Sequence, residues 1–355
     1  MRVNFVLPFL NNTGGLRVVF EHANRLSARG HRVRIYVPRV PHRWGPHPGR
    51  PRSWYWWARD LAHNLGAGDR VAWFDLDVPP RWVWRVEPRS IEPADATVAT
   101  AWPTAYWVAR LGARAGRGFY FVQHYETWNS PPGRVDASYT LPLAKIVIAS
   151  WLERLMRERF DQPVVATVTN GVNLDHWYPD GAPPEGPPTV LMQHHHEEWK
   201  GCDDGYRALE RVRRELPELR LRVFGMSSRG VPPWAEVHVD PSQAGIRRLY
   251  STSHVFLSPS WSEGCQLPPM EAMACGCAVV ATGVGGIPDY AIAGETALVC
   301  EPRRPDQLAE AMLALLRDPG RRAELAQRGR RHIRRFTWDR ATGLLEEALL
   351  RGMPA

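Results

Sequence analysis

The chain has 355 residues, 44% of them hydrophobic, and a formal net charge of +8. This length suffices for two hydrophobic cores, so two domains are expected. No stretch approaches the ~20 uninterrupted apolar residues of a membrane span. The positive charge favours anionic partners such as nucleotide-sugar phosphates or lipid headgroups. Nucleic acid is not expected, because no basic run alternates with stacking aromatic residues.

The N-terminal half alternates apolar runs with helical periodicity. Residues 3–8 predict a strand and not a signal peptide, and a loop with Gly14 and Gly15 follows. A helix then ends near Gly30, and residues 31–37 predict a second strand. This opening favours a parallel sheet with right-handed crossovers. Further elements are expected as strands at 97–100, 118–122 and 145–149 and a helix at 150–160. Residues 41–57 look irregular.

Five prolines between residues 179 and 188 indicate a linker or surface loop. A second series of strands and helices follows, with strands expected at 189–192, 221–224, 254–257, 279–281 and 297–299, and helices at 203–216, 243–251, 305–317 and 319–335. The chain therefore predicts an α/β fold of two Rossmann-like domains, residues 1–168 and 169–337. Ligands of such folds bind at the carboxyl ends of the strands.

The segment after residues 254–257 is the most informative part of the chain. Glu263 and Glu271 stand eight positions apart, with Pro268 or Pro269 suited to start a helix and Gly276 suited to end it. A helix N-terminus directs peptide N–H groups at one spot and attracts an anion. Carboxylates beside it would accept protons from hydroxyl groups. The pattern therefore predicts a site for a phosphate-linked sugar.

Residues 258–276 resemble the E-x7-E signature of retaining glycosyltransferases of family 4, which have the GT-B fold. The resemblance extends over other short segments, namely 278–282, 285–289, 170–173, 200–201 and Gly14–Gly15. It implies two domains facing each other across a cleft, with the acceptor bound by the first and the nucleotide sugar by the second. It also implies that residues 338–355 return to the N-terminal domain.

The resemblance also implies roles for individual residues. Glu271 would hold the ribose, Glu263 the donor sugar, and Lys200, one of only two lysines, the diphosphate. His124 would position the reacting sugar. The remaining expected contacts are Gly264, Cys265, Gln266, Leu267 and Asn170 for the donor, and Gly14 and Gly15 for acceptor or phosphate. The implied reaction is retaining transfer from a nucleoside-diphosphate sugar to a hydroxyl of a saccharide, a lipid-linked sugar or a small molecule. No metal or separate cofactor is expected.

Two positions depart from the family pattern. His194 and His195 stand where the family has an arginine, so the diphosphate would depend on weaker contacts, on another arginine or on a protonated histidine. The run His194–Glu198 is not expected to bind a metal, because consecutive side chains point in different directions. Cys265 and Gln266 replace an aromatic and a small residue, which alters either the donor sugar or only the packing of the loop.

Other features leave alternatives open. Five scattered cysteines fit a reducing cytoplasm. Trp44, Trp54, Trp56 and Trp57 cluster with arginines, which suits peripheral contact with the inner face of the membrane, stacking on a sugar or aglycone, or a role in the core. The alternative functions are another GT-B activity, such as a nucleotide-sugar epimerase or a phosphorylase, and a non-catalytic protein that binds sugar nucleotides.

Overall fold

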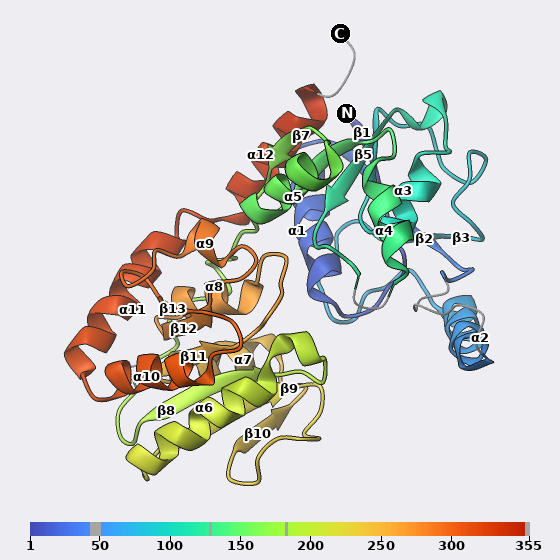
Figure 1. Ribbon diagram of the computed structural model, residues 1–355. Helices are drawn as coiled ribbons and strands as arrows, with labels where there is room; N and C mark the ends of the chain where they lie inside the picture. Colours follow the sequence, from blue (N-terminus) through green and yellow to red (C-terminus); the bar gives the residue numbers. More distant parts are fainter. Residues whose placement is uncertain (43–50, 128–129, 182–183, 352–355) are drawn as a thin grey trace. The chain divides into compact units, whose positions relative to one another are not determined.

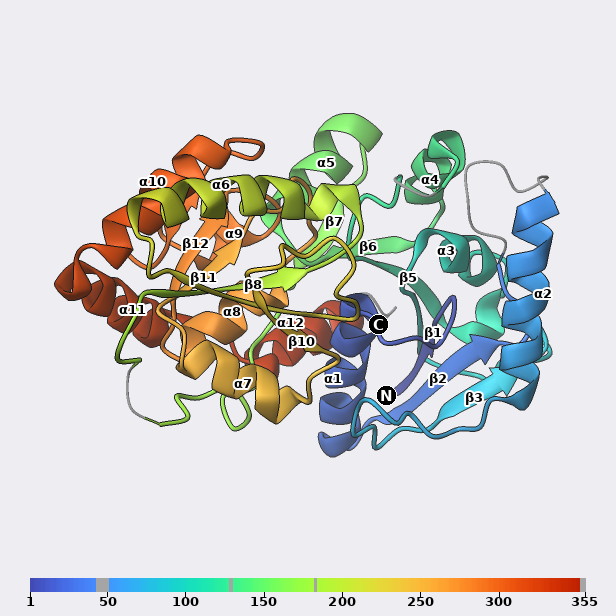
Figure 2. The same cartoon turned by 90° about the horizontal axis from the view of Figure 1, so that it is seen from below.

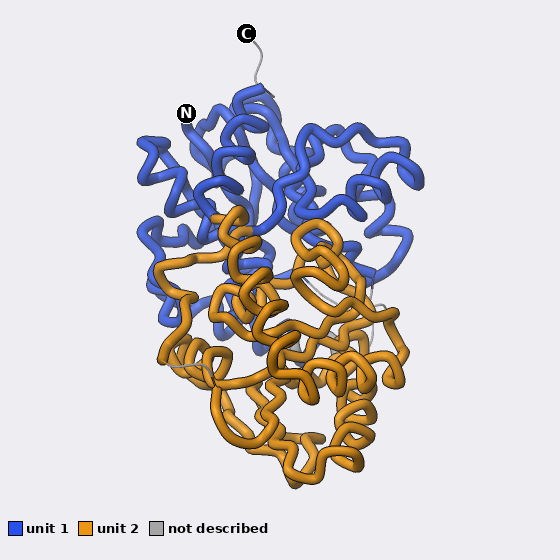
Figure 3. Tube along the Cα trace, turned by 90° about the vertical axis from the view of Figure 1, so that its left-hand side faces the viewer, with its two compact units in different colours: residues 1–170, 338–355 blue, residues 171–337 orange. Residues whose placement is uncertain are grey.

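The computed structural model describes residues 1–42, 51–127, 130–181 and 184–351. The chain divides into two compact units, Met1–Asn170 with Trp338–Ala355 and Gly171–Thr337 (Figure 3). Each unit contains one parallel β-sheet covered by helices, as the alternation of strands and helices predicted. The division of acceptor and donor binding between the two units stays a prediction.

The sheet of the first unit has seven parallel strands in the order β3-β2-β1-β4-β5-β6-β7 (Figures 1 and 2). Val3, Phe5 and Val6 of β1 are fully buried, as expected for a strand with helices on both faces of its sheet. The strands are β1 (Arg2–Val6), β2 (Arg32–Pro38), β3 (Pro80–Val83), β4 (Ala96–Ala99), β5 (Arg117–Val122), β6 (Ala144–Val147) and β7 (Val164–Thr167). The helices before the second unit are α1 (Gly14–Ala28), α2 (Pro51–Gly66), α3 (Trp102–Val108), α4 (Pro132–Tyr139) and α5 (Ser150–Phe160).

Helix α1 begins directly after Thr13, whose side chain caps the N-terminus of the helix. The Thr13 hydroxyl accepts a hydrogen bond from the N–H of Leu16, the third residue of the helix, as N-cap side chains usually do. The apolar residues that recur at helical spacing form the buried face, namely Leu16, Val19, Phe20, Ala23 and Leu26. Gly14 and Gly15 thus lie in the first turn of a helix and not in a free loop.

The C-terminal helix α12 (Trp338–Arg351) belongs to the first unit although the second unit precedes it in the chain. The imidazole Nδ1 of His22 in α1 lies 2.9 Å from the hydroxyl of Thr342. On the surface, the carboxylate of Glu346 accepts from Arg29 at 2.6 Å and lies 2.6 Å from Nε2 of His31. These contacts join residues more than 300 positions apart and attach the last helix to α1.

The sheet of the second unit has six parallel strands in the order β10-β9-β8-β11-β12-β13. Its core includes the fully buried Val190, Met192, Val255, Leu257 and Val280. The strands are β8 (Thr189–His194), β9 (Arg220–Gly225), β10 (Glu236–Val239), β11 (Val255–Ser258), β12 (Ala278–Thr282) and β13 (Leu298–Cys300). The helices are α6 (Cys202–Glu215), α7 (Gln243–Ser251), α8 (Leu267–Ala274), α9 (Ile287–Tyr290), α10 (Pro305–Leu316) and α11 (Pro319–Ile333).

The tryptophan-rich segment differs from the expectation of an irregular chain. Residues Pro51–Gly66 form the helix α2, in which apolar residues recur at helical spacing. Irregular structure was expected because the residues before Pro51 are rich in glycine and proline. Trp44 and Arg50 lie outside the described residues, as do the side chains of Arg52 and Trp56. In the part of the chain that is described, every helix is too short or too polar to cross a membrane.

Candidate functional site

Three adjacent strands of the second unit end at one edge of the sheet. β8 pairs with β11, and β11 pairs with β12, all in parallel. Their carboxyl ends therefore deliver three loops to the same place: the loop from His194 to Lys200, the loop from Pro259 to Gln266, and the loop from Gly283 to Gly286. Ligands of open parallel sheets bind at such an edge.

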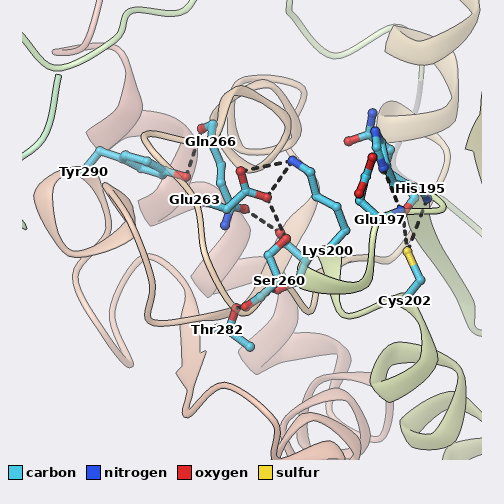
Figure 4. Close-up of polar contacts among 11 residues, drawn as sticks. His195, Glu197, Lys200, Cys202, Ser260, Glu263, Gln266, Thr282 and Tyr290 are labelled. Carbon is cyan, nitrogen blue, oxygen red and sulfur yellow. Dashed lines mark hydrogen bonds and ion pairs between the residues drawn. The ribbon is translucent and has the colours of Figure 1, made fainter. Parts of the chain in front are cut away.

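Lys200 and Glu263 meet at this edge (Figure 4). The Lys200 Nζ lies 2.8 Å from Oε1 and 3.1 Å from Oε2 of Glu263, and the Ser260 hydroxyl donates to the same Oε1 at 2.8 Å. The lysine side chain is 31% exposed and the glutamate side chain 12%. Burial of the carboxylate strengthens the attraction beyond that of a surface pair. The ion pair therefore holds an ammonium and a carboxylate in place, and the lysine side chain is partly exposed to solvent.

Two glycines bring these loops together. Gly201, next to Lys200, has φ +62°, and a Cβ there would collide with the carbonyl oxygen of Pro259. Gly285 has φ +61°, and a Cβ there would lie 2.7 Å from the carbonyl oxygen of Glu263. A residue with a side chain would displace the Glu263 loop in either case. The sequence showed both glycines but gave no structural reason for them.

The loop after β11 leads into α8, whose first residue is Leu267. Gln266 is the N-cap residue, so Pro268 and Pro269 occupy the second and third helical positions and not the first. Pro268 and Pro269 have no N–H, so Gln266 and Leu267 carry the peptide N–H groups of this helix end, where the positive end of the helix dipole attracts an anion. The predicted helix N-terminus therefore follows the loop that carries Glu263, and anion binding there stays a prediction.

Cys265 and Gln266 are both packed into the protein. The Gln266 side-chain oxygen accepts from the Ser258 hydroxyl at 2.6 Å, and its main-chain oxygen accepts from the Tyr290 hydroxyl at 3.2 Å. Cys265 lies beneath Gly286, where a Cβ would stand 2.7 Å from its sulfur. These contacts favour the simpler of the two expectations, a repacked loop. Donor contact by Gly264, Cys265, Gln266 or Leu267 stays a prediction.

Glu271 lies deeper than its position in the signature suggested. It is the fifth residue of α8, one position beyond the first turn, and is 6% exposed. The hydroxyl of Tyr250 in α7 donates to its Oε2 at 3.4 Å. The carboxyl group is therefore fixed by α7 and α8, whereas Glu263 is fixed by Lys200 and Ser260.

The two histidines in place of the family arginine differ in their surroundings. His194 has both ring nitrogens engaged, with Nε2 2.9 Å from the Arg229 carbonyl and Nδ1 2.8 Å from the Tyr206 hydroxyl. His195 Nδ1 accepts from the N–H of Glu197 at 3.1 Å, and burial next to the Lys200 cation lowers its pKa to about 4. His195 is therefore neutral at pH 7, which argues against a protonated His195 as the substitute for the arginine.

The remaining expected residues belong to the first unit. His124 follows β5, where its ring meets Trp151 edge-on with centroids 5.7 Å apart. Its main-chain carbonyl accepts from the Tyr139 hydroxyl at 3.1 Å. A Cβ on Gly15 would stand 3.4 Å from the side-chain oxygen of Gln123, so the start of α1 and the end of β5 adjoin. Asn170 is 1% exposed at the end of this unit.

Glu126 lies shortly after the carboxyl end of β5 in the first unit, and the sequence analysis did not single it out. Its Oε2 accepts from the N–H of Trp102, the first residue of α3, at 2.7 Å. Burial raises the pKa of its carboxyl to about 7. The available signal was its position two residues beyond His124, at the carboxyl end of a predicted strand.

Two doubly wound units with polar loops at their strand ends define the GT-B class of fold. Sucrose-phosphate synthase from Thermosynechococcus elongatus is similar over 99% of this chain and 98% of its own, with a TM-score of 0.74 and 17% identity. HepE from Anabaena, solved in complex with UDP-glucose, is similar over 99% and 100% of the two chains, with a TM-score of 0.72 and 13% identity. The predicted GT-B fold is confirmed.

The sequence comparisons concern mainly the second unit. Residues 175–332 match the family model Glycosyl transferases group 1. A D-inositol 3-phosphate glycosyltransferase from Rhodococcus jostii is 40% identical over 115 residues, 32% of this chain and 25% of the relative. The O-antigen chain mannosyltransferase B of Escherichia coli is 34% identical over 94 residues, 26% and 24% of the two chains. The second unit is therefore similar to the group 1 glycosyltransferases over residues 175–332, in agreement with the predicted resemblance to family 4. These alignments span about a quarter of each relative.

Proposed function

We propose that the protein is a retaining glycosyltransferase that moves a hexosyl or deoxyhexosyl group from a nucleoside diphosphate to a hydroxyl acceptor. The observation that supports this most is the Lys200–Glu263 pair beside the N-terminus of α8. The ammonium and the peptide N–H groups supply positive charge for a diphosphate, and the carboxylate supplies acceptors for sugar hydroxyls. The family match of residues 175–332 supports the same assignment.

In the proposed reaction the bond from the anomeric carbon to the diphosphate oxygen breaks while the acceptor oxygen bonds to the same face of that carbon. Negative charge grows on the diphosphate, and Lys200 together with the α8 N-terminus stabilises it. The leaving oxygen takes the acceptor proton, so no side-chain nucleophile is required. Because Lys200 provides the cationic charge, we propose that turnover is independent of a metal ion.

The direct test is release of nucleoside diphosphate from a panel of UDP-, GDP-, ADP- and dTDP-sugars. Slow release without acceptor, faster release with saccharide or lipid-linked acceptors, and a product of unchanged anomeric configuration by NMR would support transfer. The same assay in EDTA tests metal independence. Interconversion of the sugars, or phosphorolysis, would instead identify one of the other GT-B activities.

Substitution of Glu271 tests the proposed nucleoside contact. We expect Glu271→Gln to weaken binding of the matching nucleoside diphosphate about 10- to 100-fold, because a hydrogen bond to a charged group contributes roughly 1.5–3 kcal/mol. Calorimetric titration measures this affinity. Glu310→Gln, at an exposed position of α10 in the same unit, removes the same charge and should leave the affinity unchanged. Equal affinity of wild type and Glu271→Gln would remove Glu271 from the site.

A lipid-linked acceptor is favoured by one feature of α2, its exposed apolar side. Trp54 and Leu65 are 50% and 49% exposed, and the exposed Ala58 and Ala62 lie between them at four-residue and three-residue spacing on the same side. Trp84, 65% exposed, follows β3. Tryptophan together with a net positive chain suits the surface of an anionic bilayer. We propose that this side of α2 contacts such a surface.

We expect the protein to sediment with phosphatidylglycerol-containing vesicles, and the double variant Trp54→Ser/Leu65→Ser to lose most of this binding. Met226→Ser, at a 69% exposed position in the second unit, is the matched control and should bind as wild type does. Equal sedimentation of the wild type and the double variant with vesicles would contradict membrane contact by α2. A double variant that changes only self-association of the protein would contradict it as well.

A further inference from the structure

A second polar site lies at the opposite end of the first sheet from His124 and Gly15. A cavity of about 370 Å³ opens where β5, β6 and β7 begin, lined by residues that include Arg117, Thr140, Lys145 and Gln162. This volume falls in the range of small-molecule sites. Arg117 is the first residue of β5, whereas His124 follows the end of the same strand. The cavity is therefore separate from the strand ends at which the sugar-transfer residues lie.

Lys145 is an unusual residue at this position. Of the 45 lysines and arginines in the chain only Lys145 and Lys200 are lysines, and Lys145 is 2% exposed within β6. Its Nζ donates to the carbonyl oxygen of Leu141 at 2.5 Å and to the side-chain oxygen of Gln162 at 3.0 Å. Both partners are neutral, although buried charges are normally paired with an opposite charge.

The described residues that line the cavity around Lys145 include basic but no acidic side chains. None of the described residues lining the cavity is acidic, and Arg117 and Lys145 are the two cationic residues among them. Burial alone lowers the pKa of Lys145 to about 8, which agrees with a cation that lacks a carboxylate neighbour. An ammonium has three N–H donors, and two are accounted for by Leu141 and Gln162. A bound anion would accept a hydrogen bond from the third N–H and would supply the negative charge that pairs with the ammonium.

We propose that this cavity binds a small phosphate-bearing anion, inorganic phosphate or a phosphate monoester, through Lys145 and Arg117. Thr140 and Gln162 also line this space, but their side chains hydrogen-bond to other parts of the protein, so the two cations are the groups proposed to bind the anion. An anion of this size fits the cavity, and the two cations match its charge. This site would be independent of the donor site, because the latter depends on Lys200 in the second unit.

The presence of only two lysines permits a test on the unaltered protein. Brief acetylation with a lysine-specific reagent, followed by mass spectrometry, reports Lys145 and Lys200 separately. We expect inorganic phosphate or glycerol 3-phosphate to slow modification of Lys145 at least fivefold relative to sodium chloride of equal ionic strength. Protection by glycerol 3-phosphate alone would identify a monoester site. Protection of Lys200 only, or equal protection by sodium chloride, would overturn the proposal.

Thermal unfolding provides the second test, in a Lys200→Met background that weakens anion binding at the donor site. We expect phosphate to raise the melting temperature of this variant, since a ligand of the native state stabilises it. Adding Lys145→Met or Arg117→Gln should abolish the shift. Arg114→Gln removes an exposed arginine outside the cavity and should preserve it. A shift that survives Lys145→Met and Arg117→Gln would overturn the proposal, whatever the outcome of the sugar-transfer assays.

Discussion

Lys200→Met is expected to lower turnover about 100- to 1,000-fold, the usual loss when a group that stabilises developing charge is removed. The physical reason has two parts. The leaving diphosphate loses its ammonium, and Glu263, 12% exposed, is left as an uncompensated carboxylate next to it. The second part predicts that donor binding also weakens, because two negative groups then adjoin. Steady-state kinetics and calorimetry measure the two effects separately.

The double variant Lys200→Met/Glu263→Gln distinguishes these parts. Glutamine keeps the shape and an acceptor for the Ser260 hydroxyl but removes the negative charge. We expect nucleoside diphosphate affinity to recover at least partly in the double variant, whereas turnover stays low. Lys200→Arg controls for charge, since a guanidinium carries the charge in a different geometry. Normal turnover in Lys200→Met would end the proposed role of this pair.

Gly201→Ala is expected to destabilise the second unit by about 2–4 kcal/mol, the range of substitutions that overpack or strain a buried position. The new Cβ would meet the Pro259 carbonyl oxygen and lie 3.1 Å from Nε1 of Trp261. The loop after β8 would have to move away from the loop after β11, and Lys200 is the neighbouring residue. We therefore expect loss of turnover together with loss of stability, measured by denaturant unfolding and by kinetics.

Gly294→Ala is the matched control for this substitution. Gly294 belongs to the same unit and also has positive φ, +77°, but a Cβ there would meet no atom within 4 Å. Its expected cost is about 1 kcal/mol, the backbone penalty of a left-handed residue alone. The difference between the two variants in free energy of unfolding measures the cost of the steric contact between the loops at Gly201. Equal costs would show that Gly201 matters only through its φ.

Local patterns in the sequence were sufficient for the fold. Alternating apolar strands and helical periodicity predicted two parallel sheets, because most of the strands and helices show their buried face within a short segment. The patterns missed the edge strands β3, β7 and β10 and the helix α2. The segment from Ser258 to Gly276 predicted the helix N-terminus and both glutamates for the same reason, since the chain there runs through strand, loop and helix without interruption. Lys200 was identified from the resemblance and from the rarity of lysine.

The tertiary structure decided which of these residues meet. Lys200 and Glu263 are 63 positions apart and come together because β8 and β11 are neighbours in the sheet, while β9 and β10 lie on the other side of β8. No local pattern reports strand order. The direction of the His194 ring and the collision behind Gly201 likewise depend on loops from different strands. The sequence by itself therefore determined the kind of site and its candidate residues. Only the packing of distant segments determined that Glu263 neutralises Lys200 and that a lone buried lysine faces a cavity at the far end of the first sheet.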